Sequence, residues 1–369
     1  MAKGQTIVER QRRAFVPDEA WLAKQAKEPI LEPDLPIVDP HHHLWDHANH
    51  RYLLDELLAD TGTGHNITHT VYIDCRSMYR TGGPAEMSPV GETEFANGMA
   101  AMSESGLYGP TRACAGIVSY VDMTLGARAR AALEAHIAAG NGRFRGIRHA
   151  GGWDASPDVR NSHTNPPQGL YGQASYREGV AQLGALGLTY EAWQYHPQLE
   201  EVTALARAVP QTTMILNHCG GPLGIGPYAG KTDAVFAAWK ADMVELARCP
   251  NVVVKLGGLG MDIGVFDHMR RPADRPRYRR RLAAVDRDLH RGLRHRTLHV
   301  REQLPGRQDL DRLRRAVERL QADGGGRLRS GEDGAVQRYG DACLQVGMMF
   351  IASPAPLGRC RRHTAAERA

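Results

Sequence analysis

The sequence predicts an α/β protein built on a parallel sheet, and three features of its 369 residues support this prediction. Short apolar or β-branched runs recur along the chain, as expected for strands that are buried on both faces. Amphipathic helical stretches separate most of these runs. A hydrophobic content of 42% is enough to form a full core. Consecutive βα units of this kind form a parallel sheet covered by helices, and eight of them close a barrel.

Seven strands are expected before about residue 262. They are, in chain order, 36–41, 69–75, 113–121, 144–150, 187–193, 212–218 and 251–259. Helical stretches lie between most of them, and one ends at Gly140, a residue typical of a helix C-cap. No eighth apolar run follows. The sequence therefore predicts a distorted (β/α)₈ TIM barrel in which strand 8 is missing or replaced.

Composition indicates a cytoplasmic protein. The six cysteines are scattered and form no C-x-x-C pair, so reduced thiols are expected rather than disulfides or a zinc knuckle. The N-terminal stretch is charged and lacks the apolar centre of a signal peptide. No apolar run approaches the roughly 20 residues of a membrane span, so we expect no membrane partner.

Three consecutive histidines, His41 to His43, follow the first predicted strand. Side chains alternate along a strand, so His41 and His43 are expected on one side and His42 on the other. Two imidazoles spaced in this way can hold one metal ion. A surface histidine cluster or a polar loop before a helix would give the same letters. His218 favours a functional site, because it stands at the corresponding end of the sixth predicted strand, where barrel active sites lie.

Five motifs, taken together, resemble the amidohydrolase-related family of metal-dependent hydrolases over about residues 34–262. They are DPHHH (39–43), FRGIR (144–148), YHPQL (195–199), ILNHCGGP (215–222) and VVVKLGG (252–258). The family includes pyrone-dicarboxylate lactonase, fuconolactonase and aminocarboxymuconate-semialdehyde decarboxylases. The resemblance implies a TIM barrel whose active site is completed by an aspartate at the end of strand 8.

The resemblance also implies roles for individual residues. His41 and His43 would be metal ligands, and His218 would activate water or polarise a substrate oxygen. Arg148 would face an anionic substrate, although an arginine that binds loop carbonyls fits the same position. His196 and Tyr190 are further candidates for substrate binding, with Glu191 beside them. The cofactor would be a divalent metal, with zinc the first choice for imidazole ligands, but some lactonases of the family work without a metal.

The expected reaction is the attack of water on a lactone, or on a similar C–O or C–N bond, of a small carboxylated substrate. A non-oxidative decarboxylase of the same fold is the alternative. Neither reaction requires a nucleic acid partner, and a homo-oligomer is compatible with both.

The composition changes abruptly after Lys255. From residue 256 onward the chain has no lysine and no tryptophan, and it contains 24 of the 40 arginines. One interpretation is a solvated arginine-rich helix, because Leu310, Leu313, Val317 and Leu320 keep helical spacing. A second is a basic arm that binds nucleic acid, which is the alternative from another functional class.

A third interpretation, a frameshift, accounts for more of these residues. When bases two and three of each codon are joined to base one of the next, residues 293–308 can be read as FGTERCMFESNFPVDK, which resembles the family's strand-8 motif. We therefore divide the chain into an N-terminal extension (1–33), an amidohydrolase-like barrel (34–265) and an arginine-rich segment translated out of frame (266–369). We expect residues from about 270 onward to pack loosely, with no apolar strand between strands 7 and 1.

Overall fold

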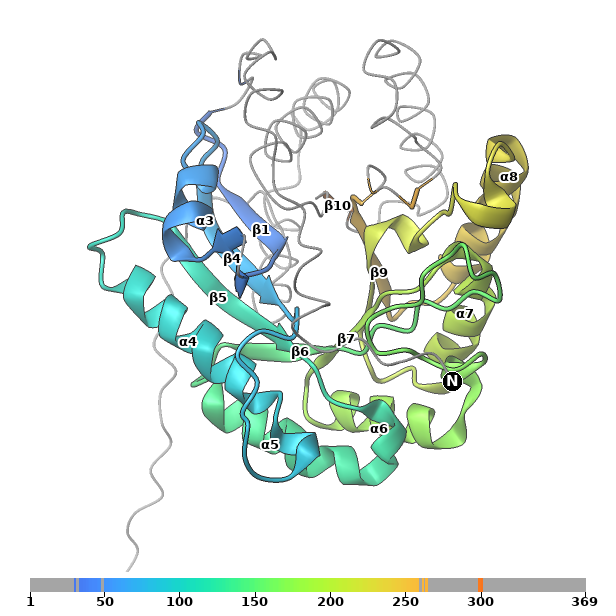
Figure 1. Ribbon diagram of the computed structural model, residues 1–369, viewed down its shortest axis with the longest axis horizontal. Coiled ribbons are helices and arrows are strands. Elements are labelled where there is room, and N and C mark those ends of the chain that lie inside the picture. Colours follow the sequence, from blue (N-terminus) through green and yellow to red (C-terminus); the bar gives the residue numbers. More distant parts are fainter. Residues whose placement is uncertain are drawn as a thin grey trace, which may run out of the picture.

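The computed structural model describes residue 30, residues 33–47, 50–258, 261 and 263–264, and the backbone of 298–300. Its main feature is a curled parallel sheet that forms a half-barrel, with helices on the outside (Figure 1). The strands follow one another in chain order across the sheet: β1 (Ile37–His42), β4 (Ile67–Ile73), β5 (Arg112–Ser119), β6 (Phe144–Arg148), β7 (Thr189–Ala192), β8 (Met214–Leu216), β9 (Val252–Leu256) and β10 (Leu298–Val300). The first seven correspond to the seven predicted strands.

Helices alternate with these strands, as the βα pattern predicts. The α-helices are α3 (Leu54–Thr61), α4 (Val90–Glu104), α5 (Ala129–Ala139), α6 (Ala174–Ala185), α7 (Leu199–Ala208) and α8 (Thr232–Leu246). Short 3₁₀ turns are η1 (Ala85–Met87), η2 (Met123–Arg128), η3 (Leu170–Gly172), η4 (His196–Gln198), η5 (His218–Gly220) and η6 (Gly226–Tyr228). The core lies between sheet and helices, where Ile117, Leu133 and Ile147 are fully buried.

A small hairpin follows β1 and was not predicted. Its strands β2 (Trp45–His47) and β3 (His50–Tyr52) pair in antiparallel fashion. Trp45 is the centre of a ring cluster in this hairpin. His47 stacks on Trp45, and the Trp45 ring centroid lies 6.2 Å from that of His43.

β1 carries one extra residue at its carboxyl end. Asp39 pairs with Thr70 and His42 with Tyr72, so three steps on β1 lie opposite two steps on β4. Such a β-bulge bends the strand and changes the direction of its side chains, and bulges are frequent beside active sites. Here the bulge contains Pro40 and His41.

The place expected for the eighth strand is taken by β10. It pairs in parallel with β9, Leu298 lying opposite Val254. The sequence predicted a strand 8 that is missing or replaced, with no apolar strand between strands 7 and 1, and the structure has a strand of only three residues, Leu-His-Val, at this place. The pairings of the described residues include none between β10 and β1. The other predictions for residues 266–369, and those for the N-terminal extension up to residue 29, lie outside the described residues.

None of the helices described is long and apolar enough to cross a membrane.

Candidate active site

Three imidazoles from two distant parts of the chain meet at the strand ends. His41 comes from β1, His43 follows β1, and His218 begins η5 directly after β8. The ring centroid of His41 lies 5.0 Å from that of His43 and 4.8 Å from that of His218. All three side chains are buried. The structure thus brings the three histidines together, as the spacing of the motifs predicts.

His42 faces the other way, also as predicted. Its Nε2 atom lies 2.8 Å from the Thr70 hydroxyl, and its ring contacts that of Tyr72 edge-on. These partners lie within the sheet and against the helices outside it. His42 is therefore a packing residue.

The tautomer of His43 follows from its hydrogen bond. Its Nδ1 atom lies 2.8 Å from the carbonyl oxygen of Ile73, so Nδ1 carries the proton and donates it. This leaves a lone pair on Nε2. Burial, followed by the charge of Arg148, holds the pKa of His43 well below its usual value, so the ring is neutral at physiological pH.

His41 lies between two cationic side chains. Its Nε2 is 3.4 Å from Nη1 of Arg148, and its Nδ1 is 3.4 Å from Nζ of Lys255. Burial, and then the positive charge of Lys255, lowers the pKa of His41 well below its usual value. His41 is therefore also neutral at physiological pH.

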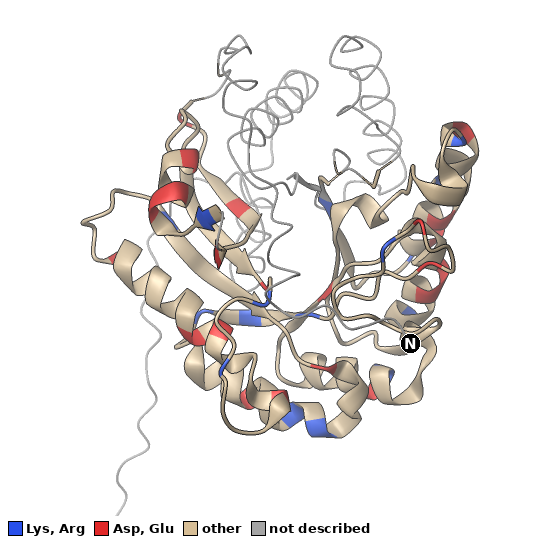
Figure 2. Cartoon of the chain, in the orientation of Figure 1, with Lys and Arg blue, Asp and Glu red and all other residues tan. Residues whose placement is uncertain are grey.

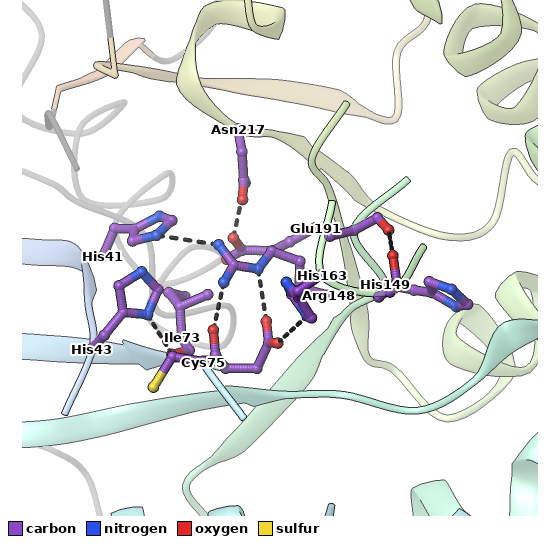
Figure 3. Close-up of polar contacts among 12 residues, drawn as sticks. His41, His43, Ile73, Cys75, Arg148, His149, His163, Glu191 and Asn217 are labelled. Atoms are coloured by element: carbon purple, nitrogen blue, oxygen red, sulfur yellow. Dashed lines mark hydrogen bonds and ion pairs between the residues drawn. The ribbon is translucent and has the colours of Figure 1, made fainter. Parts of the chain in front are cut away.

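Arg148 ends β6 and lies beside His41 (Figure 3). It is held by Asp74, the residue that follows β4. Its Nε donates to Asp74 Oδ1 at 2.6 Å, and Nη2 donates to the Asp74 carbonyl oxygen. With the contact to His41, three of the five guanidinium N–H groups have partners among the described residues, and the other two have none within that part of the chain. Both side chains of this ion pair are almost fully buried.

Lys255 and Glu191 form a second buried ion pair, which the sequence interpretation did not assign to the site. Lys255 Nζ lies 2.7 Å from each carboxylate oxygen of Glu191 and donates at 3.0 Å to the Pro40 carbonyl oxygen. Asn217 also donates to Glu191, at 2.9 Å. Figure 2 shows many of the other charged residues on the outer helices. A lone lysine in the apolar run VVVKL was the available signal.

His218 is positioned by an unusual backbone turn. His218 and Cys219 both have φ values of 51°, in the left-handed region that non-glycine residues rarely adopt. Two glycines follow with positive φ, and the Trp193 ring contacts the imidazole edge-on at 4.8 Å. Strained backbone of this kind is concentrated at functional sites. Gly220 and Gly221, the GG of ILNHCGGP, adopt the positive φ values that the turn after β8 requires.

Gly258 leaves the space that His218 occupies, which leads to a prediction. A Cβ at position 258 would lie 2.4 Å from the His218 Cβ, and the φ of Gly258 is +71°. We expect Gly258→Ala to displace His218 and to reduce activity. We also expect it to lower the free energy of unfolding by about 1–3 kcal/mol more than a variant that only strains the backbone. Gly142→Ala is the matched control, since Gly142 has φ +79° and open space around it. Equal effects of both variants on unfolding and turnover would contradict the prediction.

The structure places His196 and Tyr190 away from the three imidazoles. His196 Nδ1 accepts from the backbone N–H of Leu223, and its ring contacts Tyr228. The Tyr190 hydroxyl lies 2.6 Å from that of Tyr176 and packs in the layer beneath α6. On β7 it is the next residue, Glu191, that faces the site. The role of His196 and Tyr190 in substrate binding stays a prediction.

The described residues do not by themselves fit a divalent metal. No group of three or more His, Cys, Asp or Glu side chains among them is arranged to hold an ion. Each nitrogen of His41 already faces a cationic side chain, and a third positive charge there would be repelled. The expected strand-8 carboxylate lies outside the described residues. The assignment of His41 and His43 as metal ligands therefore stays a prediction.

Comparison with known proteins identifies the family. The sequence profile described as Amidohydrolase matches residues 38–290, which is more than half of the chain. The chain belongs to the amidohydrolase family. It is thus assigned by family to the metal-dependent hydrolases, whose members generally bind divalent metals.

Sequence relatives and solved structures agree with this assignment. An uncharacterized protein of Sinorhizobium fredii is 31% identical over 250 residues, or 62% of this chain and 74% of that protein. An L-fucono-1,5-lactonase of Burkholderia multivorans is 32% identical over 117 residues, only 32% of this chain and 36% of the lactonase. A crystal structure of an amidohydrolase from Burkholderia multivorans has a TM-score of 0.59 at 22% identity and covers 84% of this chain and 99% of that one. A second crystal form of that amidohydrolase contains zinc.

Proposed function

We propose that the site formed by this chain is that of a hydrolase, which in the version with the shifted reading attacks a lactone, or a similar C–O or C–N bond, in a small carboxylated substrate. The observation that carries the proposal is the grouping of three imidazoles with the buried Arg148, whose guanidinium has two N–H groups without a partner in the part of the chain that the structure describes. The partial likeness to an L-fucono-1,5-lactonase supports the choice of a lactone.

Different residues of the site have different roles in the proposed reaction. Water attacks the lactone carbonyl carbon, and His218 accepts the proton that the water loses. Negative charge develops on the carbonyl oxygen, where N–H groups of Arg148 or of the neutral His41 stabilise it. The ring C–O bond then breaks, and the ring oxygen takes up a proton to give a hydroxy acid. A carboxylate elsewhere on the substrate would pair with the Arg148 guanidinium.

Metal binding is a separate proposal. If a metal is bound, His41 and His43 are the imidazoles that would hold it, and zinc in a solved relative of the same fold supports that choice. A bound metal would supply Lewis-acid polarisation of the carbonyl. The steps above need only the residues of this chain.

An assay of carboxylated lactones tests the proposal. The chain as it stands and a version carrying the shifted reading from about residue 266 would both be tested, before and after treatment with a chelator. We expect hydrolysis of at least one lactone by the second version. Turnover of no lactone, with release of CO₂ from a carboxymuconate-like acid, would replace the hydrolase by a decarboxylase. Turnover of neither substrate class would overturn both functions.

A further inference from the structure

We propose that Lys255 is a positioning residue, which with Glu191 fixes the β1 bulge at Pro40 and His41 and so sets the direction of the His41 imidazole. Lys255 lies on β9 and His41 on β1, the two strands on either side of the place of strand 8. The contact therefore joins the two sides of the half-barrel beside the active site. The inference rests on the proposed function for its kinetic test.

The bulge leaves backbone groups that the β1–β4 ladder does not use. The register passes from Asp39 to His42 without pairing the two residues between them. The backbone N–H of His41 donates to the Asp39 side chain at 3.0 Å, and the Pro40 carbonyl accepts from Lys255 Nζ at 3.0 Å. Buried backbone groups need such partners. The Asp39 carboxylate and the Lys255 ammonium group thus provide hydrogen-bond partners that the β1–β4 ladder does not supply.

Glu191 makes the position of Lys255 specific. Both carboxylate oxygens lie 2.7 Å from Nζ, a length typical of charge-assisted hydrogen bonds. Glu191 is itself held by Asn217 from the end of β8. Lys255 and Glu191 are 3% and 1% exposed, so water does not compete for these bonds. The ammonium group is therefore fixed by β7 and β8 and presented to β1.

The test compares Lys255→Met, Glu191→Gln and the double variant. Each is made in the full-length chain, and the kinetic measurements use whichever version of the chain hydrolyses a lactone in the assay above. Lys240→Met is the matched control, because Lys240 is an exposed lysine on α8. A displacement of about 1 Å in a reacting group costs on the order of 100-fold in rate. We expect kcat to fall about 100-fold in Lys255→Met while KM changes little, and the control to keep its activity. In the double variant no unpaired charge remains, so it should fold, yet kcat should stay low.

A measurement without substrate separates this inference from the proposed function. Hydrogen exchange of the peptide 36–47 reports on β1, and exchange of 112–119 reports on β5. We expect faster exchange at 36–47, but not at 112–119, in both Lys255 variants. A folded double variant with wild-type kcat, or unchanged exchange at 36–47, would overturn the positioning role. If no substrate is found, the exchange result alone decides it.

Discussion

Replacing Arg148 with methionine is expected to lower the free energy of unfolding by about 3–5 kcal/mol, because it leaves a buried carboxylate without its partner. Asp74 is completely buried, and its carboxyl oxygen accepts a hydrogen bond from the guanidinium Nε. Burial already raises the pKa of Asp74, and Arg148 is the main influence that opposes this rise. Without Arg148, the carboxyl group should take up a proton in the folded protein.

The expected loss depends on pH, and its sign follows from that proton. In Arg148→Met the pKa of Asp74 is higher in the folded state than in the unfolded state. The folded state then binds more protons, so stability falls as pH rises through the folded pKa. Urea unfolding at several pH values between 5 and 8 should show a variant that is least stable at the highest pH.

Two further variants make this prediction specific. Arg145→Met is the matched control on the same strand, because the Arg145 guanidinium donates to backbone carbonyls rather than to a carboxylate. The double variant Arg148→Met, Asp74→Asn removes the unpaired charge, so its stability should change little with pH. An Arg148→Met loss no larger than that of Arg145→Met would contradict the role given to the buried pair. Affinity for a carboxylated substrate should also fall by about 10- to 100-fold, the value of a charged hydrogen bond.

The sequence predicted the position of the histidine cluster because histidines stand at the carboxyl ends of two predicted strands. Histidines at the ends of the first and sixth predicted strands led to the cluster of His41, His43 and His218, because strand ends of a parallel barrel meet at one face. Alternation also separated His42 from its neighbours. These arguments need only strand order and the period of two.

Residues on the inner strands were harder to assign for a physical reason. Both faces of a barrel strand are buried, so the apolar pattern does not show which residues point inward. That is why the neighbours Tyr190 and Glu191 were both named as candidates, although only one of two successive residues on a strand can face the site. Lys255 was missed because one lysine in an apolar strand has no partner visible in the sequence. Its partner Glu191 lies 64 positions away.

The strand β10 shows a different limit. Composition predicted no apolar strand between strands 7 and 1, and the backbone of residues 298–300 forms a three-residue strand that pairs with β9. Strand pairing uses backbone N–H and C=O groups, which every residue except proline provides in full. Leu-His-Val also alternates as a strand does. A segment can therefore form a short ladder although its composition is unfavourable for a core.

The largest effect is expected from restoring the reading frame. The shifted reading of residues 298–300 is Cys-Met-Phe, and it leads directly into FESNFPVDK, so the apolar strand and motif would fall where β10 pairs with β9. The family match ends at residue 290, just before this motif. The recovered motif has asparagine where relatives have aspartate, so even the restored site would lack the usual carboxylate.

We expect the chain as it stands to aggregate and to be inactive, and the restored chain to be soluble and active. Among the described residues no ladder joins β10 to β1, and unpaired strand edges promote association. Arginines carry charges that cannot be buried without partners, at a cost of about several kcal/mol each, and 24 of them follow residue 255. Size-exclusion chromatography, thermal unfolding and the lactone assay would compare the two chains. The coding DNA is the direct measurement: a single-base shift should lie near codons 266–279. An uninterrupted frame, with RTLHVREQLPGR present as protein in close relatives, would contradict the frameshift, and the basic segment would then be a domain whose own function must be sought.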